Sequence, residues 1–161
     1  MFILLKLYYH IFAFIKIFLY KLIYAKHLKL GKKLTFRKGF SLVIIGNGKI
    51  EIGKNVFFNN YCSVASCAKV TIGDGTIFGE NVKIYDQNHI TKDKNMPIKK
   101  QGYTSKEIHI GKHCWIASNV VILKGVSIGD NCTIGAGCII YKDVPANSIV
   151  VNKQSLLLKE L

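Results

Sequence analysis

The sequence predicts a mainly β protein in which one amphipathic N-terminal helix precedes a coil of short parallel strands. Two observations predict this fold: an uninterrupted apolar segment before Gly31, and a six-residue spacing of apolar positions after Ile45. Half of the 161 residues are apolar, which suits one domain with a core and excludes a disordered tail. The formal charge of +14 indicates an anionic partner, and we expect a membrane face or a phosphorylated ligand, not nucleic acid.

Residues 1–38 form a basic N-terminal segment made of a helix and a linker. The helix is expected to run to about Leu30, because no Gly or Pro interrupts the chain before Gly31. Residues 1–38 hold nine Lys and Arg and no acidic residue. At about 100° per residue, one arc of the helix surface collects the polar side chains and leaves the rest apolar. These residues are Lys6, His10, Lys16 and Lys21.

Two interpretations of residues 1–30 remain after simpler ones are excluded. A transmembrane span needs about 20 consecutive apolar residues, and the longest stretch without Lys runs only from Leu7 to Ile15. A signal peptide needs a basic start and a small-residue cleavage site, which are absent. The helix is expected either to lie on an anionic membrane or to pack on the protein or another subunit. The first would place a cytoplasmic protein on the inner face of the plasma membrane, helped by Lys26, Lys29, Lys32, Lys33, Arg37 and Lys38.

The strongest pattern in the chain is its period of six. Six Ile follow one another at unbroken spacing from Ile110 to Ile140. An earlier run, with one slip of two residues, holds Ile52, Phe58, Val64, Ile72, Phe78 and Ile84. This period fits neither a helix nor an ordinary strand. It fits a short parallel strand plus a tight turn, repeated so that three units make one triangular coil.

Small residues and glycines occupy fixed places in this repeat. The fifth position is small, so four of the five Cys are expected to act as compact apolar core residues: Cys62, Cys114, Cys132 and Cys138. A secreted disulfide scaffold is therefore not expected. Gly follows several of the apolar residues, where we expect the turning chain to need a positive φ. These are Gly53, Gly73, Gly79, Gly111, Gly129 and Gly135.

From about Ile45 to Val151 the chain resembles the hexapeptide-repeat acyltransferases, which fold as a left-handed parallel β-helix. Its stretch EIHIGKHCWIASNVVILKGVSIGDNCTIGAGCIIYKDVPANSIVV, residues 107–151, is similar to acetyl-CoA-dependent O-acetyltransferases acting on sugars, including those that modify bacterial surface polysaccharides. The resemblance implies an acyltransferase domain over 39–151, followed by a short tail, 152–161. The six-residue period is lost between Ile84 and Ile110, so we expect a protruding loop, 86–107. The resemblance also implies acetyl-CoA as acyl donor, a sugar or glycan acceptor, and a homotrimer with the coenzyme cleft between neighbouring subunits.

The resemblance places a catalytic His in the loop, which opens with Asp86-Gln87-Asn88-His89. Acetyl transfer needs a base to take the proton from the acceptor hydroxyl, and imidazole titrates near neutral pH. We expect His89 to be that base in a direct transfer without an acyl-enzyme. The family also places an oxyanion-binding backbone amide just after Trp115, where Ala117 replaces a common Gly and leaves the amide available.

The remaining expected site residues also follow from the resemblance. The coenzyme groove is expected to involve Trp115, Ala117, Ser118, Lys124, Ala136 and Lys142. Asn59 and Asp86 are expected to contact the acceptor. Cys67 stands where galactoside and maltose acetyltransferases have an acidic acceptor contact, which argues against those simple acceptors. An anionic sugar or a lipid-linked phosphate would suit the loop lysines Lys92, Lys94, Lys99, Lys100 and Lys106.

Two alternatives from other classes stay open. Carbonic anhydrases with the same β-helix bind zinc through three His, and this chain has His89, His109 and His113. The last two are four residues apart where that family has five, so we expect no metal site. The second alternative is a non-enzymatic scaffold that presents the basic helix to a membrane, which absence of coenzyme A binding would favour.

Overall fold

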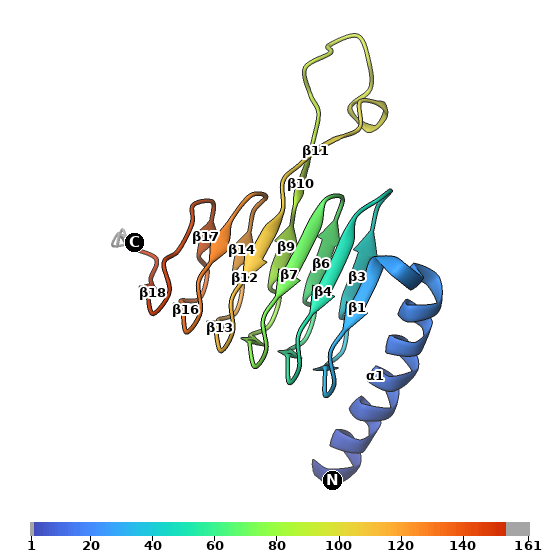
Figure 1. The fold of residues 1–161 in the computed structure, drawn as a ribbon, viewed down its shortest axis with the longest axis vertical. Helices are drawn as coiled ribbons and strands as arrows, with labels where there is room; N and C mark the ends of the chain where they lie inside the picture. The colour runs from blue at the N-terminus through green and yellow to red at the C-terminus, as the bar shows by residue number, and fades with distance from the viewer. Residues whose placement is uncertain (1, 154–161) are drawn as a thin grey trace, which may run out of the picture.

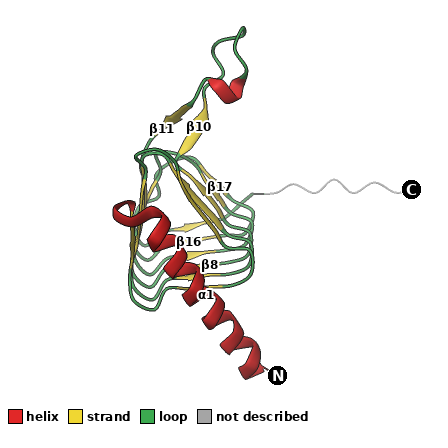
Figure 2. Ribbon diagram, turned by 90° about the vertical axis from the view of Figure 1, so that its right-hand side faces the viewer, coloured by secondary structure: helices red, strands yellow, loops and turns green. Residues whose placement is uncertain are grey.

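The computed structural model describes residues 2–153, and within the first helix it describes side chains from Tyr8 onward. Helix α1 (Phe2–Tyr24) lies across one end of a stack of short strands (Figure 1), and the short 3-10 helix η1 (Ala25–His27) leads into the stack. Viewed along the stack, the strands form the sides of a triangular coil (Figure 2). The predicted fold class, a mainly β parallel solenoid with one N-terminal helix, is confirmed.

Three parallel sheets, named A, B and C here, form the three sides. Sheet A contains β1 (Leu28–Leu30), β4 (Lys49–Ile52), β7 (Lys69–Ile72), β12 (Ile108–Ile110) and β15 (Ser127–Ile128). Sheet B contains β2 (Thr35–Phe36), β5 (Phe57–Phe58), β8 (Ile77–Phe78), β13 (Trp115–Ile116), β16 (Thr133–Ile134) and β18 (Ile149–Val150). Sheet C contains β3 (Ser41–Ile44), β6 (Ser63–Ser66), β9 (Lys83–Tyr85), β14 (Val121–Ile122) and β17 (Ile139–Ile140).

The apolar residues of the six-residue period line the inside of the coil. Each lies beside the equivalent residue of the next coil, as in the pairs Ile110–Ile128 and Ile116–Ile134. All six Ile of the second run are buried, and so are the six apolar residues of the first run. Burying one such side chain contributes about 1.5–3 kcal/mol, so the repeat holds the stack together.

Stacked aromatic rings fill the N-terminal half of the core. Phe36, Phe40, Phe58 and Phe78 form a continuous column with successive ring centroids 4.5, 4.7 and 4.4 Å apart. The core also contains four of the five Cys, as predicted, while Cys67 is only half-buried. Burial raises the pKa of the Cys62 and Cys114 thiols, which keeps these side chains protonated and unreactive.

The glycines that follow the apolar residues are needed for a reason other than the predicted one. Their φ angles are not positive; the left-handed position lies two residues further on, and it holds Asn at 55 and 81 (φ 55° and 57°) but Gly at 75 and 137 (φ 70° and 71°). A Cβ on Gly73 would lie 2.6 Å from the carbonyl carbon of Gly111 in the next coil. Gly is therefore required there because adjacent coils approach each other closely.

Helix α1 covers the open end of the core. Its inward residues are Ala13, Ile17, Tyr20 and Tyr24, which pack on the buried cluster. The Tyr20 hydroxyl accepts a hydrogen bond from the Leu42 amide at 3.1 Å. Lys16 belongs to the predicted basic arc, yet it faces the first coil and donates to the Phe40 carbonyl. One residue of the predicted basic arc is thus used against the protein itself.

The helix is also shorter than predicted. It ends at Tyr24, and Leu28–Leu30 and Thr35–Phe36 already belong to the first coil as β1 and β2. Over so short an apolar stretch, the sequence pattern does not distinguish the alternation of a strand from the periodicity of a helix. Within residues 2–153, no helix is long and apolar enough to span a bilayer.

Candidate active site

The long interruption of the repeat forms an arm that leaves the stack at the corner between sheets C and A (Figures 1 and 2). Its base is an antiparallel pair, β10 (Gln87–His89) with β11 (Tyr103–Ser105), and its tip contains the 3-10 helix η2 (Ile98–Lys100). The coils on either side of the arm remain in register, because Ile72 still lies beside Ile110. The arm therefore carries side chains away from a stack that it does not distort.

Asp86 fixes the arm at its root. The residue is fully buried, and its carboxylate accepts hydrogen bonds from the Ser66 hydroxyl at 2.7 Å and from the amides of Cys67 and Ala68 at 2.7 and 2.9 Å. A carboxylate can accept several donors at once, and three are satisfied here. Asp86 thus fixes the start of β10 from inside the protein. Its carboxylate has no exposed surface in the described chain, and the acceptor contact expected for it stays a prediction.

His89 is exposed on the arm, two residues beyond Gln87. Its ring lies 4.5 Å from that of Tyr103, its directly paired residue on β11. The side-chain oxygen of Gln87 is buried, and it has no hydrogen-bond partner in residues 2–153. An exposed imidazole supported by an aromatic ring can receive a proton from a group brought to the arm. Sequence reasoning missed Tyr103 and Gln87, since their relation to His89 depends on the hairpin register.

Trp115 lies on a different side of the coil. It is 53% exposed on sheet B, in register with Ile77, which is itself beside Phe57. These three side chains form an apolar ridge along the outside of sheet B. In the triangular cross-section, sheet B is the side opposite the corner from which the arm leaves (Figure 2). One chain therefore does not bring His89 and Trp115 together.

The backbone after Trp115 has one amide that could bind an oxyanion, but this amide belongs to Ser118 and not to the expected Ala117. The Ala117 amide donates to the Ile134 carbonyl at 2.8 Å, so the prediction that it is available is wrong: it belongs to the ladder between coils. The next amide, that of Ser118, donates to no group within the described residues. Gly79 makes room for it, because a Cβ there would lie 2.5 Å from the Ser118 nitrogen.

The other expected donor-site residues lie on the C-terminal coils. Lys124 donates from Nζ to the Thr104 hydroxyl at 2.6 Å, which ties the arm to the following coil. Lys142 is exposed, with its ammonium 5.7 Å from the centroid of the Tyr141 ring. Ala136 is also exposed. The positions at which the sequence predicts the coenzyme groove thus offer two lysines and an exposed alanine.

Asn59 lies at the corner between sheets B and C, away from the arm of the same chain. Its side-chain oxygen accepts hydrogen bonds from Arg37 at 3.2 Å and from the Asn60 amide at 2.9 Å. Its amide nitrogen can still donate to a ligand. Like Trp115, Asn59 could meet His89 only across two chains.

The arrangement of the histidines does not favour the zinc alternative. His89 is on the arm, His109 is on β12 with its Nδ1 2.8 Å from the Thr71 hydroxyl, and His113 is at the following corner. No group of three candidate metal ligands occurs in the part of the chain that the structure describes.

Comparison with known proteins matches both the repeat and the fold. The bacterial transferase hexapeptide family (six repeats) matches residues 107–142. Nodulation protein L of Rhizobium meliloti (strain 1021) is 45% identical over 102 residues, which are 63% of this chain and 55% of that protein. The putative lipopolysaccharide biosynthesis O-acetyl transferase WbbJ of Escherichia coli (strain K12) is 29% identical over 137 residues, covering 81% of this chain and 70% of WbbJ.

A solved structure of galactoside acetyltransferase in complex with coenzyme A aligns with a TM-score of 0.65 at 34% identity. The alignment covers 75% of this chain and 58% of that one. The chain thus spans little more than half the length of two of these three relatives. Residues 107–142 thus carry the hexapeptide repeat, and the proteins that the chain resembles include sugar and polysaccharide O-acetyltransferases.

Proposed function

We propose that this protein transfers an acetyl group from acetyl-CoA to a sugar hydroxyl, in the biosynthesis of a surface polysaccharide. The observation that carries the proposal is the exposed His89, presented on an arm whose root is held by the three hydrogen bonds to Asp86. The relationship to WbbJ and to a coenzyme A-binding galactoside acetyltransferase supports the donor and the acceptor class.

His89 acts as the general base in a direct transfer. Its imidazole takes the proton of the acceptor hydroxyl as that oxygen attacks the thioester carbon of acetyl-CoA. The carbon–sulfur bond then breaks, and the proton passes from the imidazolium to the departing coenzyme A sulfur, which leaves as a thiol. The unpartnered Ser118 amide is suited to stabilise the oxyanion that forms between these steps.

The working enzyme is a homotrimer with shared sites. The ridge of Phe57, Ile77 and Trp115 and the arm of the same chain lie on opposite sides of the coil, which supports a site built from two neighbours. In this assembly, His89 of one protomer approaches Trp115 and Ser118 of the next. Lys124 and Lys142 line the coenzyme groove from the side of the arm, and Ala136 lines it from the corner between sheets B and C, where Asn59 contacts the acceptor.

The acceptor is anionic or is carried on a lipid phosphate, and the enzyme lies on the cytoplasmic face of the membrane. Five exposed lysines on or beside the arm support the anionic acceptor: Lys92, Lys94, Lys99, Lys100 and Lys106. The apolar outward side of α1 supports the membrane location.

The deciding experiment is an acetylation screen with radiolabelled acetyl-CoA over sugars, sugar nucleotides and isolated glycans. With the acceptor that responds, His89→Ala should lower turnover by a factor on the order of a hundred to ten thousand and leave coenzyme A affinity nearly unchanged. His10→Ala, an exposed histidine on α1, is the matched control and should retain wild-type turnover. Wild-type turnover in His89→Ala would remove His89 from the mechanism. No acetylation together with no coenzyme A binding in calorimetry would leave the non-enzymatic scaffold.

A further inference from the structure

Helix α1 has a broad apolar outward face, bordered by the exposed His10 and Lys21. Phe14, Phe18 and Leu22, spaced by four residues along one row, are 74%, 63% and 70% exposed. Neighbouring exposed positions add Tyr8, Ile11, Phe12, Ile15, Leu19 and Ile23. A soluble surface helix normally shows the reverse pattern, with its polar face outward. Contiguous exposed apolar surface of this kind marks an interaction site.

A groove with a cationic rim runs beside this face, between α1 and the first coil. Its volume is about 310 Å³, and its apolar walls include Tyr9, Phe12 and Phe36. Lys16, Arg37 and Lys38 complete the lining. The Phe40 carbonyl takes one of the three N–H donors of Lys16, so the others can still bind an anion. Apolar walls with a cationic rim suit a molecule that has a hydrocarbon chain and a phosphate head.

The positive charge of this end of the molecule favours an anionic lipid, and not a second copy of this chain, as the partner of the outward face of α1. Residues 1–50 contain no carboxylate side chain, because the first acidic residue is Glu51. Two copies of the same cationic end would repel each other, whereas an anionic lipid surface supplies the missing negative charge. The exposed cations around the helix and first turns include Lys21, Lys26, Lys32, Lys33, Arg37 and Lys38.

We propose that α1 lies in the surface of an anionic bilayer, with its outward face in the acyl region and lipid phosphates bound at the groove by Lys16, Arg37 and Lys38. The helix crosses the end of the stack (Figure 2), so the axis of the stack points away from the membrane surface. This deepens the location given under the proposed function. In a trimer with parallel coils, three helices lie on one end and bind the same bilayer, which multiplies their affinity.

Point variants test this better than a deletion of residues 1–30, because that deletion also removes β1 and the inward side of α1. Flotation with phosphatidylcholine vesicles containing about one third phosphatidylglycerol should show binding that weakens as salt is added. Phe14→Glu with Phe18→Glu should abolish binding. The control, Ile139→Glu with Ile149→Glu, changes two exposed apolar residues on the distal coils and should bind as the wild type does.

The groove is tested by charge removal. Arg37→Gln with Lys38→Gln should weaken vesicle binding by about fivefold per charge, on the order of twentyfold together. Lys99→Gln with Lys112→Gln, two exposed lysines away from α1, should change it much less. Equal losses in the two charge variants would overturn the groove site.

The oligomeric mass separates the lipid from a protein partner. Phe14→Glu with Phe18→Glu should keep the wild-type sedimentation mass without vesicles, as well as acetyl transfer to a soluble acceptor. Wild-type protein that ignores the anionic vesicles, or a mass that falls in this variant, would overturn the proposal and identify the face as a subunit contact. Loss of vesicle binding with intact transfer leaves the enzymatic function standing, so the two proposals fail separately.

Discussion

At the scale of single residues, the position of the Ser118 amide depends on the absence of a side chain at Gly79. A Cβ at that position would meet the Ser118 nitrogen at 2.5 Å and its hydroxyl oxygen at 2.8 Å. Neither neighbour is the flexible end of a long side chain, so the backbone of Ser118 must move. Gly79 is in this sense a positioning residue for the proposed oxyanion donor.

Gly79→Ala should therefore lower kcat by about ten- to a hundredfold, because a misplaced oxyanion donor loses part of the rate enhancement that it provides. Gly73→Ala is the matched control, because its Cβ would press on the backbone of Gly111 in the same way but on a different side of the coil. Both variants should lose a similar amount of stability, about 1–3 kcal/mol, in thermal unfolding. Equal kcat values in the two variants would show that Gly79 serves packing alone.

Residue roles were harder to predict than residue positions. The inward places of Ile110 to Ile140 followed directly from the period, because only a coil of parallel strands repeats every six residues. The pattern does not show which backbone amides donate hydrogen bonds to the next coil, so the prediction of a free Ala117 amide is wrong. Likewise, the pairing of Tyr103 with His89 depends on the register of a hairpin with no repeat to fix it.

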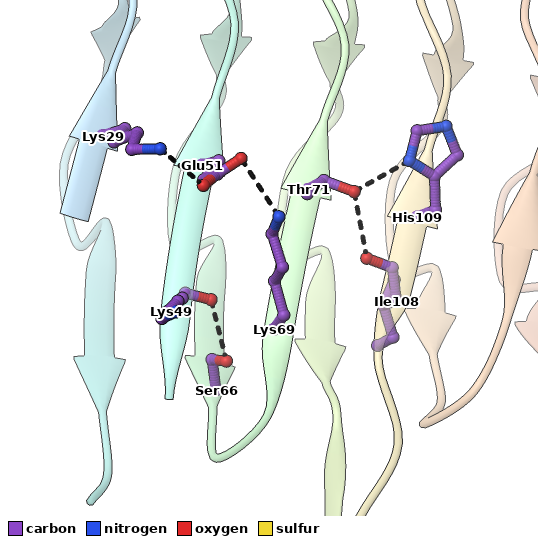
Figure 3. A network of polar contacts seen from close by, with 8 residues as sticks. All are labelled: Lys29, Lys49, Glu51, Ser66, Lys69, Thr71, Ile108 and His109. Carbon is purple, nitrogen blue, oxygen red and sulfur yellow. Dashed lines mark hydrogen bonds and ion pairs between the residues drawn. The ribbon is translucent and has the colours of Figure 1, made fainter. Parts of the chain in front are cut away.

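At the scale of elements, the outer face of sheet A is held by polar contacts between neighbouring strands (Figure 3). Glu51 on β4 pairs with Lys29 on β1 at 3.1 Å and with Lys69 on β7 at 3.3 Å. The hydrogen bond from Lys29, helped by Lys69, holds the pKa of Glu51 below its ordinary value. Thr71 and His109 continue the same row at 2.8 Å.

This pairing gives sheet A a pH-dependent contribution to stability. Since the folded pKa of Glu51 lies below the unfolded one, its stabilising effect is present above the ordinary Glu pKa and is lost as the pH falls through the folded value. Glu51→Gln should lower the free energy of unfolding by less than about 1 kcal/mol near neutral pH, because the pair is partly solvated.

Urea unfolding at about pH 7 and about pH 3 measures this, and the difference between variant and wild type should vanish in acid. Glu107→Gln, an exposed carboxylate beside β12, is the control and should show a smaller difference at both pH values. A loss for Glu51→Gln that persists in acid would indicate a packing effect and not an ionic one.

Helix α1 shows why element boundaries were less predictable than the repeat. An apolar segment interrupted by single lysines fits a helix up to Leu30, yet Leu28 and Leu30 alternate as a strand of the first coil. Their strand partner, β4, lies beyond the local window from which a helix is inferred. Tertiary pairing thus ends the helix earlier than the local pattern suggests.

At the scale of the whole molecule, shared sites predict complementation between two inactive variants. His89→Ala removes the proposed base, and Trp115→Ala removes the side chain proposed to lie beside the coenzyme on the neighbouring subunit. In mixed trimers, some sites combine the intact His89 of one subunit with the intact Trp115 of the other.

Mixing the two variants under conditions that exchange subunits should therefore restore a substantial part of the activity, whereas each variant alone stays impaired. Sedimentation of the wild type should show a trimer. The control is a mixture of His89→Ala with the double variant His89→Ala/Trp115→Ala, which contains no intact base and should stay inactive. A monomeric mass with full activity would refute the shared site.

The arm leaves the register of the stack unchanged, since Ile72 pairs with Ile110 and Ile84 with Ile122 in the strands before and after the arm. Its residues 90–100 are almost entirely solvent-exposed, so changes of length or composition there leave the core untouched. Under the proposed function, the arm can therefore change its acceptor preference while the coils stay under strict packing constraint. If the arm selects the acceptor as we propose, grafting the arms of different relatives onto this one stack is a route to altered glycan specificity.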